Sequence, residues 1–305
     1  MYIEQAYTRK YDFVKYLPIP IFFFLLMLIN YAATLVMGTD TDKLIHEMIK
    51  QQGEMSVFIQ TVAPLGAFLI VLLIWVRLVH RQSLTSLTTA RPAISWKRFF
   101  TSFFIWGGLS AGMIWIAYLS APENFEWNFK LQPFLTLLVA SVILIPLQTS
   151  FEEYLFRGYL MQGLGIATRS RLFPLLFTSI TFGLMHIANP EVEKMGPLVL
   201  VYYIGTGLFL GIITLMDDGM ELALGFHAAN NLAACLLVTS DWSALQTPSV
   251  LKDLSVPAAG FDVIAPVFIF YPLLLFVFAK IYGWTGWKER LTSKITLPSK
   301  QSLTH

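Results

Sequence analysis

Apolar residues fill this chain in long runs, and the polar residues fall mostly in the short segments between them. A helix needs about 20 apolar residues to cross a bilayer core of about 30 Å, and eight runs approach or exceed that length. The predicted spans cover residues 18–37, 56–78, 99–120, 133–155, 173–189, 197–216, 220–239 and 262–282. The pattern therefore predicts an all-α, polytopic transmembrane helical bundle with about eight spans.

The composition supports a membrane protein. Of the 305 residues, 56% are hydrophobic and 13% are charged, about half the charged share of a soluble protein. The mean hydropathy is +0.63. Such a chain cannot present a solvated surface on all sides, so we expect a lipid bilayer around it. A net charge of +2 without a basic cluster argues against a nucleic-acid partner, and the oligomeric state stays unpredicted.

Lysine and arginine positions orient the predicted bundle. With the N-terminus in the cytoplasm, sixteen of the 21 Lys and Arg residues lie on the cytoplasmic side and five on the opposite side. Arg9, Lys10 and Lys300 are among the sixteen. Cytoplasmic loops of membrane proteins carry such an excess. The bias predicts an N-in, C-in, multi-pass protein of the cell inner (plasma) membrane.

The order of the runs divides the chain into three segments. Residues 1–132 hold the first three spans and their loops, and residues 133–239 hold spans four to seven. Residues 240–305 hold the last loop, the final span and a basic cytoplasmic tail. The charged and imidazole side chains inside spans concentrate in the middle segment, which is therefore the predicted functional core.

The fourth run ends on charged residues where a membrane helix should continue. Eighteen residues without charge, 133–150, precede Glu152, Glu153 and Arg157. Glu153 and Arg157 are four apart, so on a helix they share a face and can form an ion pair. Glu152 is rotated about 100° from Glu153. We expect the helix to continue to about Leu164 with these charges turned into the bundle, because charged groups avoid lipid.

Two later spans each carry a histidine with a second residue four positions away. These pairs are Phe182 with His186, and His227 with Asn231. The spacing puts both members of each pair on one helix face. Each feature also has a purely structural explanation, such as an interfacial ion pair or a hydrogen-bonded packing residue. Their concentration in one half of the chain favours a functional site.

These residues form three motifs that resemble a known family. "EEYLFR" fits E-E-x-x-x-R, "FGLMH" fits F-x-x-x-H and "HAANN" fits H-x-x-x-N, in this order along the chain. The set resembles the CPBP family of intramembrane proteases (CAAX proteases and bacteriocin-processing proteins, also called the Abi family). That family includes the type II CAAX prenyl endopeptidases. The resemblance covers about residues 133–239.

The resemblance implies an intramembrane endopeptidase that hydrolyses a peptide bond in a membrane-associated or lipidated protein or peptide. Glu152 would be the catalytic glutamate, activating water as a general base. Glu153 would be the second, supporting glutamate, held by Arg157. The active site would open toward the cytoplasm, which supplies the water.

The other motif residues would act on the scissile carbonyl. His186 would assist the water or this carbonyl. His227 and Asn231 would polarise the carbonyl and stabilise the oxyanion, as donors in a water-poor site can do. Phe182 is the motif aromatic and would pack beside them.

Other functions and a metal remain open at this point. The motifs could persist in a non-proteolytic membrane regulator or bacteriocin-immunity protein that acts by binding. Buried Glu, His and Arg also suit a proton-coupled transporter, although the sequence has no evident internal repeat. Glu152, His186 and His227 could form a two-His, one-carboxylate site for a divalent metal. A glutamate protease needs no metal, so we expect no cofactor.

Overall fold

A computed structural model describes residues 1–8, 11–38 and 40–297. Each predicted span is occupied by a helix. The bounds are α1 (Pro18–Met37), α3 (Glu54–Trp75), α5 (Trp96–Ser120), α6 (Leu131–Glu153), α8 (Leu172–Leu184), α10 (Val199–Met216), α11 (Glu221–Leu237), α12 (Phe261–Ala265) and α13 (Tyr271–Tyr282). The expected helical membrane bundle is therefore confirmed. Arg9, Lys10 and Lys300, which count toward the predicted membrane orientation, lie outside the described residues.

Six helical stretches in the described part of the chain are long and apolar enough to cross a membrane. They are Phe13–Val36, Glu54–His80, Trp96–Ser120, Leu131–Thr168, Val199–Met216 and Val263–Tyr282. Helix α8 is apolar but shorter, and α11 has only 17 residues. The chain is a multi-pass membrane protein. The number of eight spans and the cytoplasmic placement of both termini stay predictions.

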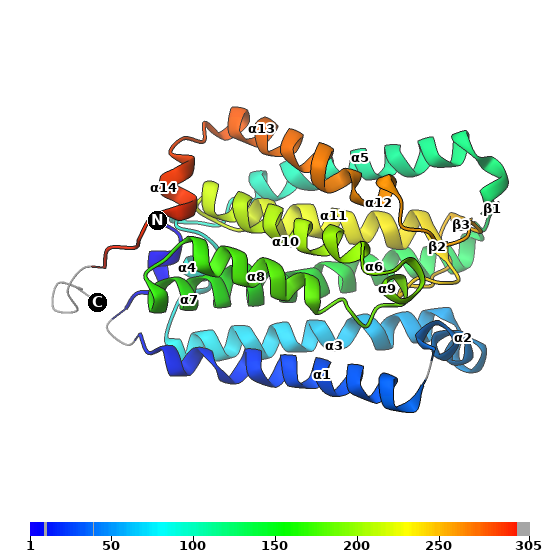
Figure 1. Cartoon of the computed structure of the whole chain (residues 1–305), viewed down its shortest axis with the longest axis horizontal. Helices are drawn as coiled ribbons and strands as arrows, with labels where there is room; N and C mark the ends of the chain where they lie inside the picture. The colour runs from blue at the N-terminus through cyan, green and yellow to red at the C-terminus, as the bar shows by residue number, and fades with distance from the viewer. Residues whose placement is uncertain (9–10, 39, 298–305) are drawn as a thin grey trace.

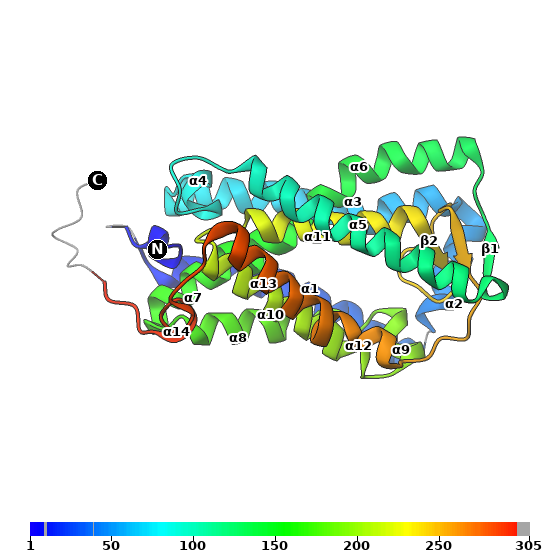
Figure 2. The same cartoon turned by 90° about the horizontal axis from the view of Figure 1, so that it is seen from above.

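The long helices run side by side along the long axis of the molecule, and both described chain ends lie at the same end of the bundle (Figures 1 and 2). The shorter elements at this terminal end are η1 (Ile3–Ala6), η2 (Phe13–Tyr16), η3 (Val76–His80), α4 (Leu84–Thr88), α7 (Met161–Thr168) and α14 (Trp287–Thr292). The opposite end holds α2 (Thr41–Gln52), η4 (Pro122–Asn124) and α9 (Pro190–Met195). Chain ends at the same end of the bundle agree with an even number of membrane crossings.

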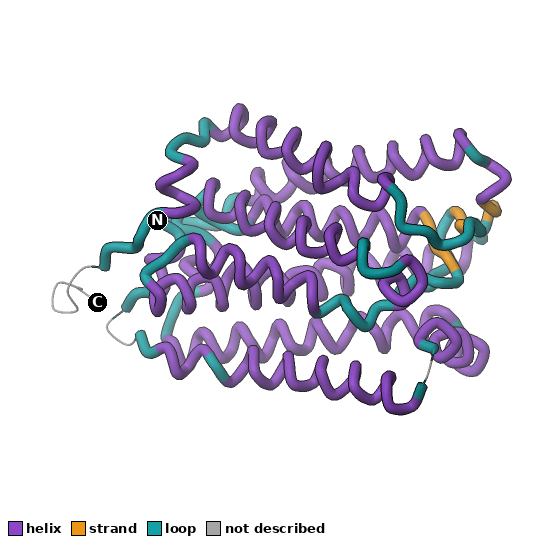
Figure 3. Tube along the Cα trace, viewed as in Figure 1, coloured by secondary structure: helices purple, strands orange, loops and turns teal. Residues whose placement is uncertain are grey.

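A small sheet at the opposite end modifies the expected all-α architecture (Figure 3). Its strands are β1 (Phe125–Trp127), β2 (Val238–Ser240) and β3 (Leu251–Asp253). β3 lies in the middle, antiparallel to β1 and parallel to β2. The pairing ties the loop after α11 to the connection before α6, so the two helices are fixed to each other at this end.

Two glycines allow close approaches between helices in the core. Helix α11 packs against α5 and α6, and α10 packs against α8. A Cβ added at Gly225 of α11 would lie 2.0 Å from the carbonyl oxygen of Phe99 in α5. One added at Gly207 of α10 would lie 2.7 Å from the carbonyl oxygen of Ser179 in α8. Any larger residue would push these helices apart.

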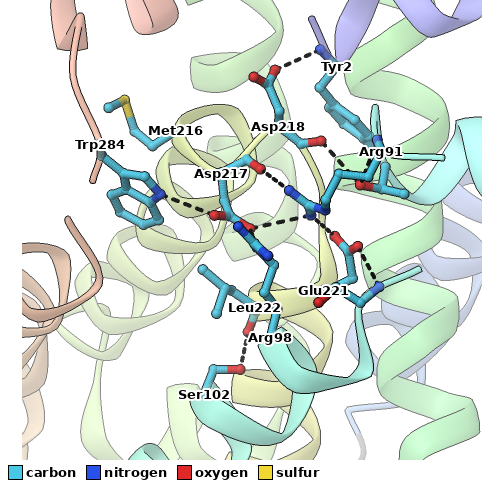
Figure 4. A network of polar contacts seen from close by, with 12 residues as sticks. Tyr2, Arg91, Arg98, Ser102, Met216, Asp217, Asp218, Glu221, Leu222 and Trp284 are labelled. Atoms are coloured by element: carbon cyan, nitrogen blue, oxygen red, sulfur yellow. Dashed lines mark hydrogen bonds and ion pairs between the residues drawn. The ribbon is translucent and has the colours of Figure 1, made fainter. Parts of the chain in front are cut away.

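Ion pairs hold the turn between α10 and α11 at the terminal end (Figure 4). Arg91 donates to Glu221 at 2.5 Å and lies 3.4 Å from Asp217. Arg98 Nε donates to Asp217 at 2.8 Å, and Trp284 Nε1 donates to the other oxygen of that carboxylate at 3.1 Å. The donors come from the loop before α5, from α5 itself and from the segment after α13. They fix the start of α11, the helix that carries His227.

Candidate active site

The fourth predicted helix continues through its charged residues. Helix α6 passes without a break into the π-helical segment η5 (Tyr154–Leu160) and then into α7, so the helical stretch runs from Leu131 to Thr168. The expected extension to about Leu164 is confirmed. The π-helical segment begins immediately after the two glutamates. Such segments are rare in α-helices and occur frequently at functional sites.

Glu153 and Arg157 form a fully buried ion pair, both side chains being 0% exposed. Arg157 Nη1 donates to Glu153 Oε1 at 2.9 Å, and Nη2 donates to the carbonyl oxygen of Gly207 at 3.1 Å. The guanidinium carbon lies 4.3 Å from the centroid of the Phe182 ring, a cation–π contact. The pair that the spacing predicted is therefore present, and it connects the fourth helix to α8 and α10.

His227 of α11 lies between the two glutamates. Its Nδ1 is 2.8 Å from Glu153 Oε1, and its Nε2 is 3.7 Å from Glu152 Oε2. A carboxylate oxygen accepts, so Nδ1 carries a hydrogen and donates it to Glu153. Glu153 thereby fixes the orientation of the imidazole, with Nε2 toward Glu152.

Gln148 is a site residue that the sequence did not single out. It lies one turn before Glu152 on α6, is buried, and donates from Nε2 to Glu152 Oε1. Its own Oε1 accepts a hydrogen bond from Asn231 Nδ2 at 3.0 Å. The available signal was the four-residue spacing of a buried amide and a carboxylate, which allows a hydrogen bond along one helix face.

His186 lies in a turn, so its prediction as a helical residue is wrong. Helix α8 ends at Leu184, and residues 185–188 form a turn. Asn189 is extended, with ψ of 143°, and precedes Pro190. Proline disfavours the helical conformation in the residue before it, which ends the span early.

Phe182 packs against both histidine rings. Its centroid lies 5.1 Å from that of His186 and 5.8 Å from that of His227. His186 Nδ1 lies 2.8 Å from the Phe182 carbonyl oxygen, so this nitrogen also carries its hydrogen as a donor. The His186 ring also stacks on Tyr203 of α10, with centroids 4.2 Å apart. His186 is thus held beside the site through Phe182.

The predicted residues therefore converge on one place. Five of them form a hydrogen-bonded or closely paired cluster together with Gln148: Glu152, Glu153, Arg157, His227 and Asn231. Phe182 and His186 pack beside it. Within the described ranges, no three His, Cys, Asp or Glu side chains are grouped so that they could hold a metal ion. The independence of metal stays a prediction.

Two oxygens in this cluster accept no hydrogen bond from the residues that the structure describes: Oε2 of Glu152 and Oε2 of Glu153. Buried polar atoms usually have a partner, so each exception needs an explanation. Glu152 Oε2 is the oxygen that faces His227 Nε2. The two atoms are 3.7 Å apart, too far for a direct hydrogen bond.

Comparison with known proteins supports the resemblance seen in the motifs. Residues 131–233 match the family described as type II CAAX prenyl endopeptidase Rce1-like. A protein of Bacillus subtilis (strain 168), "Uncharacterized protein YyaK", is 32% identical over 165 residues, which are 54% of this chain and 55% of that protein. The chain thus spans about half the length of the curated relative that it matches. No solved structure gives a match. All seven predicted site residues lie within the segment that the family model matches.

Proposed function

We propose that this chain, whose residues 131–233 carry the Rce1-like match, is an intramembrane endopeptidase that hydrolyses a peptide bond with a water activated by Glu152. The observation that carries the proposal is the geometry around His227. Its Nδ1 is bonded to Glu153 and its Nε2 lies 3.7 Å from the unpaired oxygen of Glu152. Glu152 is then the base, and Glu153 is the support that Arg157 holds in place.

The hydrogen on His227 Nδ1 decides what Nε2 can do. In the neutral imidazole, a hydrogen on Nδ1 leaves a lone pair on Nε2. Two acceptors then face each other, Nε2 of His227 and Oε2 of Glu152, and a water between them can donate one hydrogen to each. With hydrogen bonds of about 2.8 Å, this water lies to one side of the line that joins the two atoms, which are 3.7 Å apart. Such a water keeps its lone pairs free for attack on a carbonyl carbon.

The same reasoning assigns the carbonyl side of the reaction to Asn231 and not, as the resemblance implied, also to His227, because a neutral His227 with its hydrogen on Nδ1 cannot donate from Nε2. Asn231 uses one amide hydrogen on Gln148, which leaves the second to donate to a substrate carbonyl or to the developing oxyanion. Each such donor is worth about 2.7–4 kcal/mol of transition-state stabilisation in a water-poor site. His186, whose Nδ1 is bonded to the Phe182 carbonyl oxygen, has Nε2 left over, and from the adjacent turn it would assist the water or the scissile carbonyl.

The proposed substrate is a membrane-associated or lipidated protein or peptide, because the reacting groups lie inside a bundle of apolar helices. We place the protein in the inner (plasma) membrane, with the site open toward the cytoplasm. The excess of Lys and Arg on that side of the predicted topology supports this orientation.

Replacement of Glu152 by glutamine tests the proposal. Membrane proteomics compares cells that produce the wild-type chain with cells that produce Glu152→Gln, and peptides that only the wild type cuts identify the substrate. Purified protein is then assayed on that substrate. General-base catalysis contributes about 10²–10⁴ in rate, so the variant should be slower by at least about 100-fold. Glu126→Gln, which changes an exposed carboxylate on β1, is the matched control and should cleave normally.

Cleavage at the wild-type rate by Glu152→Gln would refute the proposal. Unchanged biological activity in that variant, without any cleavage, would favour a regulator or immunity protein that acts by binding. Ion-dependent uptake that the mutation abolishes would favour a transporter.

A further inference from the structure

A chain of side-chain hydrogen bonds leads from Trp106 on α5, through two asparagines of α11, to Glu152 on α6. Trp106 Nε1 donates to Asn230 Oδ1 at 3.0 Å, and Asn230 Nδ2 donates to Asn231 Oδ1 at 3.1 Å. Asn231 Nδ2 donates to Gln148 Oε1 at 3.0 Å, and Gln148 Nε2 donates to Glu152 Oε1. Helices α5, α11 and α6 each contribute to it. The motifs include only Asn231 and Glu152 of these five residues.

The two ends of this chain fix its direction. The indole of Trp106 can only donate, so the Asn230 atom that it contacts must be the oxygen. The hydroxyl of Tyr202 lies 3.5 Å from the same oxygen. At the other end an ionised Glu152 can only accept, so Gln148 must present its nitrogen. Each amide between them then has one possible orientation. A flipped amide would place its oxygen against a neighbouring acceptor and its nitrogen against a neighbouring donor.

We propose that Gln148 is a positioning residue for Glu152, and that Trp106 and Asn230 set its orientation through Asn231. The inference rests on the proposed function, in which Glu152 is the base. Hydrogen-bonded side chains that are all satisfied hold each other in one arrangement. The neutral amide keeps Glu152 Oε1 occupied, so that Oε2 alone faces His227.

The same chain also orients the donor for the oxyanion. If Asn231 flipped, its oxygen would face both Gln148 and the substrate carbonyl, and the donor would be lost. Because Trp106 fixes Asn230, and Asn230 fixes Asn231, a residue that touches neither water nor substrate decides which atom Asn231 presents.

Nuclear magnetic resonance on the full-length chain in detergent micelles tests this connection without any need for cleavage. Protein labelled with ¹⁵N-glutamine gives one side-chain amide signal for Gln148, which is assigned by its loss in Gln148→Met. Trp106→Phe keeps an aromatic ring against Phe226, whose centroid is 4.5 Å away, but removes the donor. Asn230→Asp keeps the volume and removes the donor to Asn231. Both variants should move the Gln148 signal.

Ser102→Ala is the matched control. Ser102 lies one turn before Trp106 on α5 and donates to the carbonyl oxygen of Leu222 in α11 at 2.7 Å (Figure 4). The variant therefore removes a buried hydrogen bond between the same two helices without touching the amide chain. It should leave the Gln148 signal in place.

Kinetics on the substrate found by proteomics supply the second measurement. Hydrogen bonds to charged groups are the stronger ones, so Gln148→Met should lower kcat by about 10- to 100-fold with KM unchanged. Trp106→Phe and Asn230→Asp should lower kcat by about 3- to 10-fold, again with KM unchanged. Ser102→Ala should cleave at the wild-type rate.

The outcomes separate this inference from the proposed function. A Gln148 signal that stays in place in both Trp106→Phe and Asn230→Asp would overturn the connection. If Glu152→Gln abolishes cleavage while Gln148→Met cleaves like the wild type, the proposed function holds and the positioning role is wrong. Normal cleavage by Glu152→Gln would overturn both.

Discussion

Replacement of Arg157 by methionine tests whether the buried ion pair organises the site. The guanidinium donates to Glu153 and to the carbonyl oxygen of Gly207, and methionine can donate to neither. Loss of one partner from a buried ion pair costs about 3–5 kcal/mol, because the other charge stays out of water. In a chain of this size 1 kcal/mol lowers the midpoint of thermal unfolding by about 2 °C. We therefore expect Arg157→Met to lower the midpoint by about 6–10 °C.

The chain carries its own reporter for this measurement. Cys235 is its single cysteine and is 1% exposed. A thiol-specific fluorescent dye therefore reacts when α11 becomes accessible, and the reaction can be followed while detergent-solubilised protein is heated. Arg157→Lys is an informative companion, because lysine keeps the charge but lacks the fork that reaches Glu153 and Gly207 together.

A double variant separates charge from packing. Glu153→Gln alone leaves Arg157 without its anion and should also be destabilised by about 3–5 kcal/mol. Glu153→Gln with Arg157→Met leaves neither charge, so its midpoint should be well above the value obtained by adding the two single losses. If the losses simply add, the two residues do not stabilise each other and the assigned ion pair is wrong.

Three further predictions follow from separate parts of the structure. Gly225→Ala should lower the unfolding midpoint by about 2–6 °C, since its Cβ would meet the backbone of α5. Gly108→Ala, with nothing within 4 Å of the added Cβ, should not. EDTA should leave the cleavage rate unchanged, and a loss restored by added zinc would place a metal in the site. Burial raises the pKa of Glu191, which lies in the short helix α9 outside the spans, above its usual range. The stability that this group contributes is full below its unfolded value and is lost as pH rises through the raised value, so Glu191→Gln should raise the midpoint relative to wild type near pH 7 but not near pH 4.

The part of the site that lies along one helix could be predicted from the sequence. Glu153 and Arg157 are four residues apart after an uncharged run. Charged groups avoid lipid, so within a membrane such a pair is expected inside the bundle. The pair is found there, on a helix that continues through it. The spacing alone did not predict that the turns between them are π-helical.

Contacts between helices could not be predicted in the same way. Gln148 is uncharged and sits in an apolar run, so hydropathy gives it no weight, although its amide needs partners once it is buried. Asn230 is not a motif position, and its partner Trp106 lies 124 residues away in the chain, so the sequence gives no sign of their contact. The end of α8 before His186 had a readable signal in Asn189 and Pro190, but the apolar run outweighed it.

The net charge of the cluster gives a reason for a second glutamate beside the proposed base, Glu152. Glu152 and Glu153 bring two negative charges and Arg157 one positive charge, so with His227 neutral the cluster holds one uncompensated negative charge out of water. A buried unpaired charge is costly. When Glu152 takes a proton from the attacking water, the charges of Glu152, Glu153 and Arg157 sum to zero, while the negative charge moves to the substrate oxygen beside Asn231. In the proposed mechanism, Glu153 therefore acts through charge as well as orientation, because its negative charge beside the site favours transfer of the proton from the water to the protein.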